Sequence, residues 1–563
     1  MELRVVAFLL RYQPYIAAPP ELGREISRFL GPSSNLALSE ACVYSSTALL
    51  DWIWESSCSS IAERLQRWSL NNFLRCDNHY YKWQFAKGME FVARDGNMDI
   101  LEWFFKHFQG CVVSVDIVEL AAENGHLDVL IYLQEHAVAR ECYSEAPVNW
   151  TGPGHCVCWE GHSLHRACRN GHGHVVRWLL EYRPHGLTVR MKETLIRAAL
   201  NAGLVGLAQF FLPAARHIAD YVNEYSHPQA LEVAITSGHL TLNQNSAVVA
   251  IRNLAKAGRL DLIKRVPETI PWFDRVLVSG DCLCQWRLAI QEAIRRSDMH
   301  MIRWFLKHPI GQALLAEAKM MKYSLGFASA AANTAILQYL NDEDLLADDY
   351  EDGLVHAVHN GRLEAVKWLL SHVTNFPKLK QYNLMDVAAK LGYLDILQFF
   401  HGSTLSKERG GLRQIRLKGC STEAMDYAAA NGHLEVVQWL HMNRSEGCTT
   451  KAMNSAAKEG HLEVVKWLYR NRSEGCTFKA LEKAIGHGQL RVACWLRTHY
   501  PEHVPAMVGK HICSERALEI LLFLHVNHPH VVTMRFCANM KRDDNSGSCL
   551  FVSEWMEAHC SDD

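Results

Sequence analysis

Internal repetition dominates this sequence and limits the folds open to it. Three segments align at 28 residues without a gap: Cys420 to Gly447, Cys448 to Gly475 and Cys476 to His503. The first two share the letters GHLEVVxWL and NRSEG, and the third keeps a weaker version of the pattern around Gly488. Self-similarity at a short fixed period indicates a protein built by stacking one supersecondary unit. Each unit then buries its apolar surface against its neighbours.

Thirteen candidate copies align when the glycine of the repeat is used as an anchor. An alanine stands four residues before the anchor in eleven of them, and an aromatic residue stands seven residues after it in eleven. A small residue recurs where two helices approach closely, and we expect the aromatic residue to belong to the helical core. Gly238 and Gly258 are only twenty residues apart, which leaves the repeat identity of this region open. The anchors are Gly96, Gly125, Gly171, Gly203, Gly238, Gly258, Ser297, Ala332, Gly361, Gly392, Gly432, Gly460 and Gly488.

The apolar pattern within one copy predicts a helical hairpin. The first half carries a stripe of helical period, as at Ala452, Met453, Ala456 and Ala457. Gly460 is placed to end this helix. A second stripe from Leu462 to Leu468 fits another short helix that returns antiparallel after a tight Gly-His turn. The sequence therefore predicts an all-α fold, a solenoid of helical hairpins.

These residues resemble the ankyrin repeat, whose pattern runs T-P-L-H, A-A and then G-H-x-x-V-V-x-L-L. The best single match runs from Ser163 to Leu180. The 28-residue copies are similar to the short ankyrin-type repeats of large families found in oomycetes, some amoebae and giant viruses. The resemblance covers about residues 88 to 527, and it implies an ankyrin-type helical-hairpin solenoid with a helical N-terminal cap or module.

The resemblance also implies a protein partner bound along the concave helix face, which would make the chain a non-catalytic interaction scaffold. Lys451 to Asn454 stand where T-P-L-H would be, and the copies lack the residues that build a projecting hairpin tip, so binding through long fingers is not expected. Varied polar positions of the first helices are the candidate partner-binding residues, although each can equally be solvated helix surface. They are Glu423, Asp426, Tyr427, Lys451, Asn454, Ser455, Lys479, Glu482 and Lys483.

Three regions follow along the chain. Residues 1–87 precede the repeats as a helical N-terminal module or cap. Residues 88–527 form the repeat solenoid, of about 13 units. Residues 528–563 are expected to be a C-terminal cap or a flexible tail.

A cluster of histidines and cysteines falls in the longest gap between anchors. Gly125 and Gly171 are 46 residues apart, which is longer than the 28-residue spacing of the regular copies. The additional residues predict an insertion loop near 138–160. The spacing of the cluster lacks the second pair of a usual zinc site, so a metal-dependent enzyme is the least favoured alternative and no metal or cofactor is expected. The cluster consists of His155, Cys156, Cys158, His162, His165 and Cys168.

The N-terminal region weakly resembles an F-box, the short helical module that docks a substrate receptor onto a cullin-type ubiquitin ligase. Ala18 stands where leucine is usual, and Ser45 where a tryptophan often sits. The resemblance implies a second function, a substrate receptor recruiting the ligase through residues 19–52. The alternative is a plain helical cap, since every solenoid must shield its open ends. The matching residues are Pro19, Pro20, Glu21, Leu22, Glu25, Ile26, Phe29, Leu30, Leu36, Leu38 and Cys42.

Composition and missing motifs argue against several other classes of function. With 58 Lys plus Arg against 60 Asp plus Glu, the formal charge is −2, and there is no long basic run, so neither nucleic acid nor a membrane is expected as a partner. No G-x-S-x-G, Walker loop, dinucleotide fingerprint or H-E-x-x-H motif occurs, so we expect no enzyme. There is no signal-peptide core and no long apolar span, which predicts a cytoplasmic or nuclear protein.

Cysteines and histidines that recur in register have structural explanations. Cys420, Cys448 and Cys476 are expected to be small, reduced residues buried in the turns, because stacked units lie about 8 to 10 Å apart and a disulfide needs Cα atoms within about 7 Å. Histidines that follow the anchor glycines are expected to pack and cap the turns. They are His126, His172, His239, His433 and His461.

Overall fold

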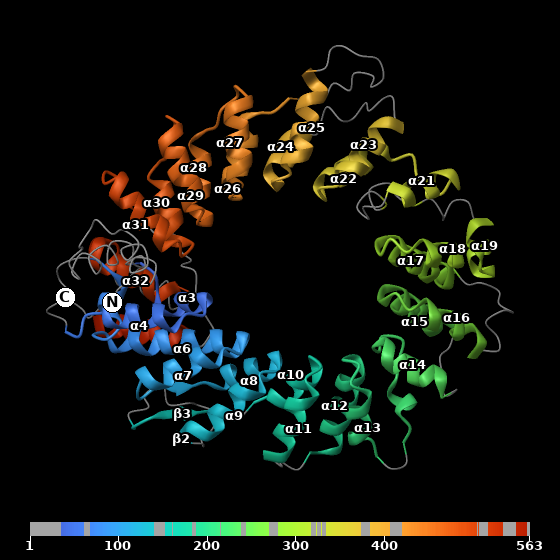
Figure 1. Ribbon diagram of the computed structural model, residues 1–563, viewed down its shortest axis with the longest axis horizontal. Coiled ribbons are helices and arrows are strands. Elements are labelled where there is room, and N and C mark those ends of the chain that lie inside the picture. The colour runs from blue at the N-terminus through green and yellow to red at the C-terminus, as the bar shows by residue number, and fades with distance from the viewer. Residues whose placement is uncertain are drawn as a thin grey trace, which may run out of the picture. The chain divides into compact units, whose positions relative to one another are not determined.

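The computed structural model (Figure 1) describes residues 35–60, 68–139, 152–159, 161–182, 187–213, 216–237, 244–269, 280–316, 323, 328, 334–372, 383–405, 419–503, 505, 516–532 and 548–559. These residues are mostly helical, which confirms the predicted fold class. In its first half the chain forms α3 (Leu38–Ala41), η1 (Cys42–Tyr44), α4 (Thr47–Glu55), η2 (Leu70–Phe73), α6 (Asn78–Asp95), α7 (Met98–His107), β1 (Val112–Val113), α8 (Val115–Asn124), α9 (Leu127–His136), β2 (Ala137–Ala139), β3 (His155–Val157), α10 (Ser163–Arg169), α11 (Gly173–Tyr182), α12 (Val189–Asn201), α13 (Val205–Phe211), η3 (Ile218–Tyr221), α14 (Pro228–Thr236), α15 (Gln244–Ala257) and α16 (Leu260–Thr269).

The second half continues the same alternation of short helices. It contains α17 (Gly280–Arg295), α18 (Met299–Lys307), α19 (Pro309–Ala316), α21 (Thr334–Asp342), α22 (Tyr350–His359), α23 (Leu363–His372), α24 (Leu384–Leu391), α25 (Leu394–Leu405), α26 (Thr422–Ala430), α27 (Leu434–Asn443), α28 (Thr450–Glu459), α29 (Leu462–Asn471), α30 (Lys479–Gly486), α31 (Leu490–His499), α32 (Ala517–Asn527), η6 (Pro529–Val531) and α34 (Ser548–His559). No described helix is both long and apolar enough to cross a membrane.

Two compact units make up the chain. Unit 1 contains residues 1–167 and 476–563, from the two ends of the sequence, together with the short turn 457–462. Unit 2 contains residues 168–456 and 463–475. Within unit 2 the hairpins follow one another along the chain, and the first helices α22, α24 and α26 lie side by side (Figure 1).

Each anchor glycine ends the first helix of its hairpin. Gly392 has a φ of +80°, in the left-handed region that favours glycine. The N–H groups of Gly392 and Tyr393 donate to the carbonyls of Ala389 and Ala388 at 3.2 and 3.0 Å, which closes the helix as a Schellman motif. Positive φ is found at all the described anchors, including the serine. These are Gly96, Gly125, Gly171, Gly203, Gly258, Ser297, Gly361, Gly392, Gly432, Gly460 and Gly488.

A side chain from the next copy covers the anchor glycine. A Cβ atom on Gly392 would lie 2.6 Å from two ring atoms of His433. His126 covers Gly96 in the same way, and its Nε2 lies 2.8 Å from the carbonyl oxygen of Arg94 at the end of α6. Both histidines therefore pack over the turns, as the sequence predicted, and His126 also caps the end of α6. His239, Gly238 and Ala332 lie outside the described residues.

Replacing Gly392 by alanine should destabilise unit 2 by about 1 to 3 kcal/mol, because alanine disfavours positive φ and its Cβ would press on the His433 ring. Gly402→Ala is the matched control. Gly402 lies within α25, and a Cβ there would meet nothing within 4 Å. The control should be neutral or stabilise by up to about 1 kcal/mol. Chemical denaturation of both variants measures the difference, and equal stabilities would contradict this account of the anchor.

The region of doubtful repeat identity lacks a complete hairpin. Helix α14 precedes Gly238, and the next described element is α15, which pairs with α17 and α16 as the first helix of the following copy. Asn245, the residue in place of the recurring aromatic, lies within α15. No second helix belonging to the Gly238 copy occurs among the described residues. Among the described residues, α15 is thus the next helix after α14.

A small parallel sheet adds the only described strands to the helical fold. Its order is β1-β3-β2, with Val112 opposite Cys156 and Ala137 opposite His155. The strand β3 lies inside the predicted insertion, between β1 and β2. Residues 140–151 of the insertion lie outside the described part of the chain.

The recurring aromatic residue is mostly not in the core, so that prediction was wrong. Trp103 is buried, but Trp368, Trp439, Trp467 and Trp495 are only half-buried. The fully buried positions are the aliphatic residues around them on the second helix, such as Val464, Val465 and Leu468 in α29. Several of the aromatic rings instead stack on a histidine one turn later, as Trp368 does on His372 at 4.0 Å. An indole ring is wider than the face that one short helix buries. Part of each ring therefore stays exposed at the edge of the helix.

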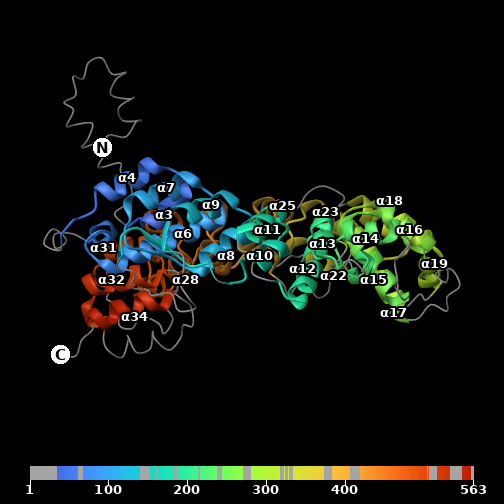
Figure 2. The same ribbon diagram turned by 90° about the horizontal axis from the view of Figure 1, so that it is seen from below.

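Helices from the two ends of the sequence share the core of unit 1. Helix α34 lies against both α32 and α6 (Figure 2). Trp555 of α34 is buried, and its Nε1 donates to Asp77 at the N-cap of α6 at 3.2 Å. Helix α32 is apolar on all sides, and every residue from Ala517 to Leu524 is buried. The sequence predicted a helical module or cap at the N-terminal end and a cap or flexible tail at the C-terminal end, and among the described residues helices from both ends pack together.

Candidate functional site

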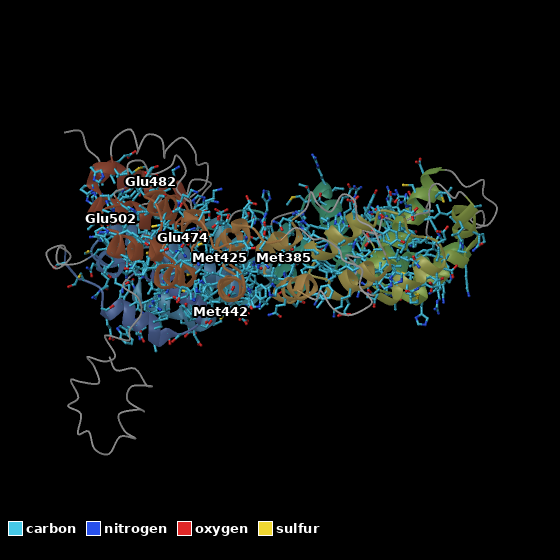
Figure 3. The ribbon with its side chains drawn as sticks, turned by 90° about the horizontal axis from the view of Figure 1, so that it is seen from above. Met385, Met425, Met442, Glu474, Glu482 and Glu502 are labelled. Atoms are coloured by element: carbon cyan, nitrogen blue, oxygen red, sulfur yellow. The ribbon has the colours of Figure 1, made fainter. Side chains whose placement is uncertain are left out.

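The first helices of unit 2 present a polar face between buried positions. Glu423 and Tyr427 of α26 are exposed, as is Lys451 of α28, and Ser455 is half-buried. Met385 and Met425, labelled in Figure 3, lie on the neighbouring first helices α24 and α26 and are buried between the hairpins. The buried positions are nearly the same in each copy, whereas the exposed positions differ.

Lys390 belongs to this face, although the sequence analysis did not single it out. It is exposed on α24, and its Nζ lies 5.4 Å from the centre of the Tyr427 ring, within the range of a cation–π interaction. The signal that could have found it is its position two residues before an anchor glycine, where copies also vary. We call Lys390, Glu423, Tyr427, Lys451 and Ser455 the first-helix surface of unit 2.

Asp426 and Asn454 do not belong to that surface, because both are buried. Asp426 is 5% exposed, and it accepts hydrogen bonds from the N–H and hydroxyl of Thr449 in the next copy, at 2.8 and 2.7 Å. Asp386 makes the same pair of bonds to Ser421. A carboxylate at this position therefore holds the N-terminus of the following first helix, where its negative charge is favourable. Asp426 thus links two copies and is not accessible to a partner.

The remaining candidate residues lie in unit 1, on α30. Lys479 and Lys483 are exposed and Glu482 is half-buried. They occupy the register of Lys451, Asn454 and Ser455 in the preceding copy. All three are accessible to a partner.

The conserved linker between copies has a structural role. Arg472 and Glu474 form an ion pair, and the Arg472 guanidinium covers Gly447, whose φ is +74°. Arg444 and Glu446 pair in the same way one copy earlier. Beside these pairs, burial raises the pKa of Cys420 to about 12 and that of Cys448 to about 11. Both cysteines are buried and free, so the turns contain inert thiols rather than nucleophiles.

The histidine and cysteine cluster of the insertion is dispersed in the structure. His155, Cys156 and Cys158 are buried at β3, and the His155 ring stacks on Phe85 at 4.9 Å. The thiol of Cys168 donates to the carbonyl of Leu195 at 3.4 Å. His162 and His165 are exposed and half-buried on either side of Ser163. Among the described residues, no three His, Cys, Asp or Glu side chains are grouped so as to hold a metal ion.

The described part of the F-box-like segment packs into unit 1. Leu38 of α3 and Cys42 of η1 are buried, and α3 lies against α6. Residues 19–34 of the segment lie outside the described residues. Val43 and Tyr44 are exposed beside them.

Comparison with known proteins identifies the repeat in part of the chain. The family model for ankyrin repeats (many copies) matches residues 385–441, 425–469 and 453–497. Residues 385–497 therefore contain ankyrin repeats, which indicate a protein–protein interaction scaffold. No curated protein matches the chain.

Solved structures of another helical-repeat class show a low overall similarity. One is the pentatricopeptide repeat protein PPR10 from maize, at 11% identity and a TM-score of 0.26, covering 87% of this chain and 75% of that one. Another is PPR10 in complex with an 18-nt psaJ RNA element, at 11% identity and a TM-score of 0.24, covering 85% of each chain.

The prediction that nucleic acid is not a partner is corrected by this comparison. It relied on the charge of −2 and on the lack of a basic run. Two of the similar structures hold a helical-repeat protein with RNA, so a helical-repeat architecture does not exclude nucleic acid. At these TM-scores the similarity assigns no RNA binding to this chain either.

Proposed function

We propose that this chain, whose residues 385–497 are ankyrin repeats, is a non-catalytic scaffold that binds a partner protein through the first-helix surface of unit 2. The observation that carries the proposal is a contrast within the first helix of each copy: its buried positions repeat from copy to copy, whereas its exposed positions vary. Ala424, Met425 and Ala428 of α26 are buried, and α28 repeats this pattern. Packing therefore fixes these positions and leaves the exposed ones free to vary for a partner.

The chemistry of the surface suits a polar partner with acidic groups. Lys390 and Lys451 are exposed on α24 and α28, and the ring of Tyr427 lies on the helix between them. Tyrosine is among the residues that contribute most binding energy at interfaces, and lysines beside it attract and orient a partner that carries acidic groups. Glu423 is the acidic member of the surface, so it would select against a partner that is acidic throughout.

Reversing the charge of both lysines (Lys390→Glu with Lys451→Glu) should weaken binding of the partner about tenfold or more, because interface charges steer and orient association. The free energy of unfolding should fall by no more than about 2 kcal/mol, since both residues are exposed and the loss is limited to the cation–π contact of Lys390 and its favourable place in the last turn of α24. Lys479→Glu tests the equivalent position of unit 1 in a separate variant.

The partner is first identified by a photo-crosslinking residue at position 451. The matched control carries it at position 463, an exposed glutamate on the second helix α29 of the same copy. A protein crosslinked from 451 but not from 463 is then purified, and its affinity for the charge-reversed chain is measured by calorimetry. Equal affinity for both chains would rule out this surface. Loss of binding on deleting residues 141–150 alone would assign the interaction to the insertion, a deletion that spares the buried strand β3.

A further inference from the structure

A buried carboxyl group joins the two ends of the chain within unit 1. Glu519 of α32 is 4% exposed. Its Oε1 accepts hydrogen bonds from Trp83 Nε1 and Gln84 Nε2 of α6, both at 2.9 Å. These bonds connect residues more than 430 positions apart, and Trp83 and Gln84 are themselves buried. The group therefore lies at the centre of the contact between the N-terminal and C-terminal helices.

The second oxygen of Glu519 has no hydrogen-bond partner among the residues that the structure describes. Its Oε2 is buried and unpaired, and so is the hydroxyl of Tyr80, one helical turn before Gln84 on α6. An ionised carboxylate with one bare oxygen is costly in such a site. A protonated carboxyl group carries no charge, keeps Oε1 as the acceptor and turns Oε2 into a donor. Protonation thus removes the cost of burying the charge, which outweighs the hydrogen bond from Trp83 that by itself lowers the pKa of Glu519.

The nearby charges also favour the neutral carboxyl group. Glu40 of α3 lies close enough to oppose a second negative charge, and Arg516, the cation that lowers the pKa of Glu519, is itself held in an ion pair with Glu40 at 2.7 Å. Burial first, and then Glu40, raise the pKa of Glu519 to about 7. The titratable and charged groups on the surrounding elements include Glu40, Asp77, Tyr80, Lys87, Arg491, Arg497, Arg516, His525, His528, His530 and His559.

We propose that protonated Glu519 is a latch between the two ends of the chain, and that loss of its proton releases α32 from α6. An ionised Glu519 regains water only if α32 moves away from Trp83 and Gln84. Such a movement exposes the apolar residues of α32 and loosens α34, which lies against both helices. The latch is a conformational device separate from the first-helix surface, which lies in unit 2.

The expected pH dependence follows from the two states of the latch. When the junction opens, Glu519 returns to an ordinary pKa near 4.5, whereas in the closed junction its pKa is about 7. The closed state therefore binds the proton more tightly, and its stability is full below about pH 4.5. Between these values the opening constant rises about tenfold per pH unit, and above pH 7 the rise levels off.

His528 acts in the opposite direction and has to be separated from the latch. Burial lowers its pKa, with Arg497 and His530 contributing, so its charging destabilises the junction as the pH falls. The Glu519→Gln variant keeps His528 and isolates the glutamate. Its amide oxygen can accept from Trp83 and Gln84, and its NH₂ group replaces the donor of the protonated acid.

Hydrogen exchange of the full chain tests the proposal, with each rate corrected for the intrinsic pH dependence of exchange. In the native sequence, protection of the α32 amides should fall about fivefold from about pH 6 to about pH 7 and by no more than about twofold above pH 7. In Glu519→Gln this fall should be absent. Protection of α24 and α26 in unit 2 should not change over this range in either protein.

A second variant keeps the test decisive if Glu519→Gln does not fold. Glu40→Gln retains an acceptor for Arg516 but removes the charge that opposes ionisation of Glu519. The fall in α32 protection should then level off at a lower pH than in the native sequence. A native chain without the fall, a Glu519→Gln chain that retains it, or an unshifted profile in Glu40→Gln would each overturn the proposal.

Discussion

Replacing Trp83 by alanine should lower the free energy of unfolding of unit 1 by about 3 to 5 kcal/mol. Trp83 is 1% exposed on α6, and it contacts the C-terminal helices through Glu519 and the ring of Phe551. Its removal leaves a large cavity and takes away one of the two donors to Glu519 Oε1 at the same point. Protection from hydrogen exchange should fall in α6, α32 and α34 together, because helices from both ends of the sequence share this core.

The control for Trp83 is Glu90→Ala on the same helix. Glu90 makes an ion pair with Lys87 at 3.1 Å, and its side chain is 40% exposed. Exposed pairs of this kind contribute about 0 to 1 kcal/mol. If Trp83→Ala leaves α32 and α34 as protected as in the native chain, the two ends do not stabilise each other.

Replacing Trp286 by alanine should cost a similar amount, about 3 to 5 kcal/mol, in the other unit. Trp286 lies on α17 and is fully buried, its ring packs edge-on against Phe305 at 5.0 Å, and its Nε1 donates to the Phe305 carbonyl at 3.3 Å. Because each hairpin contacts only its neighbours, protection should fall in α15, α17 and α18 and remain in α32.

The exposed Cys284 of the same helix supplies the matched control, since Cys284→Ala should change stability by less than about 0.5 kcal/mol. Measured side by side, the two tryptophan variants distinguish local from global cooperativity. Loss of protection throughout the chain in both variants would contradict a stack of nearest-neighbour repeats.

The repeated features of the fold could be predicted from the sequence. The left-handed anchor at Gly392 and the buried alanine at Ala388 depend on contacts within one hairpin and its nearest neighbour. Because the same contacts recur in every copy, the same type of residue recurs at a fixed spacing in the sequence. Even Ser297, which stands at the anchor position in place of glycine, has a positive φ of +58°.

Which faces are exposed could be predicted only in part. Alternation of apolar and polar residues marks Lys451 and Tyr427 as surface, but it marks Asp426 as surface too, because a carboxylate on a short helix is usually solvated. Its partner is the N-terminus of the next first helix, and pairing with backbone N–H groups does not show in the type of residue. The half-buried Trp467 was misjudged for the complementary reason, since a large apolar ring need not be enclosed.

The sequence by itself determined the repeating hairpin, its length and its turns, because those depend on interactions a few residues to one copy apart. Only the tertiary structure decided that Trp83, Gln84 and Glu519 meet, and that α32 and α34 complete the core begun by α6. This contact joins residues more than 430 positions apart and is not repeated from copy to copy. It therefore leaves no repeating pattern in the sequence. From the sequence alone, Glu519 would be taken for a solvated charge. In the folded chain it is buried at the junction, where two donors bind one of its oxygens and the other oxygen is shielded from water.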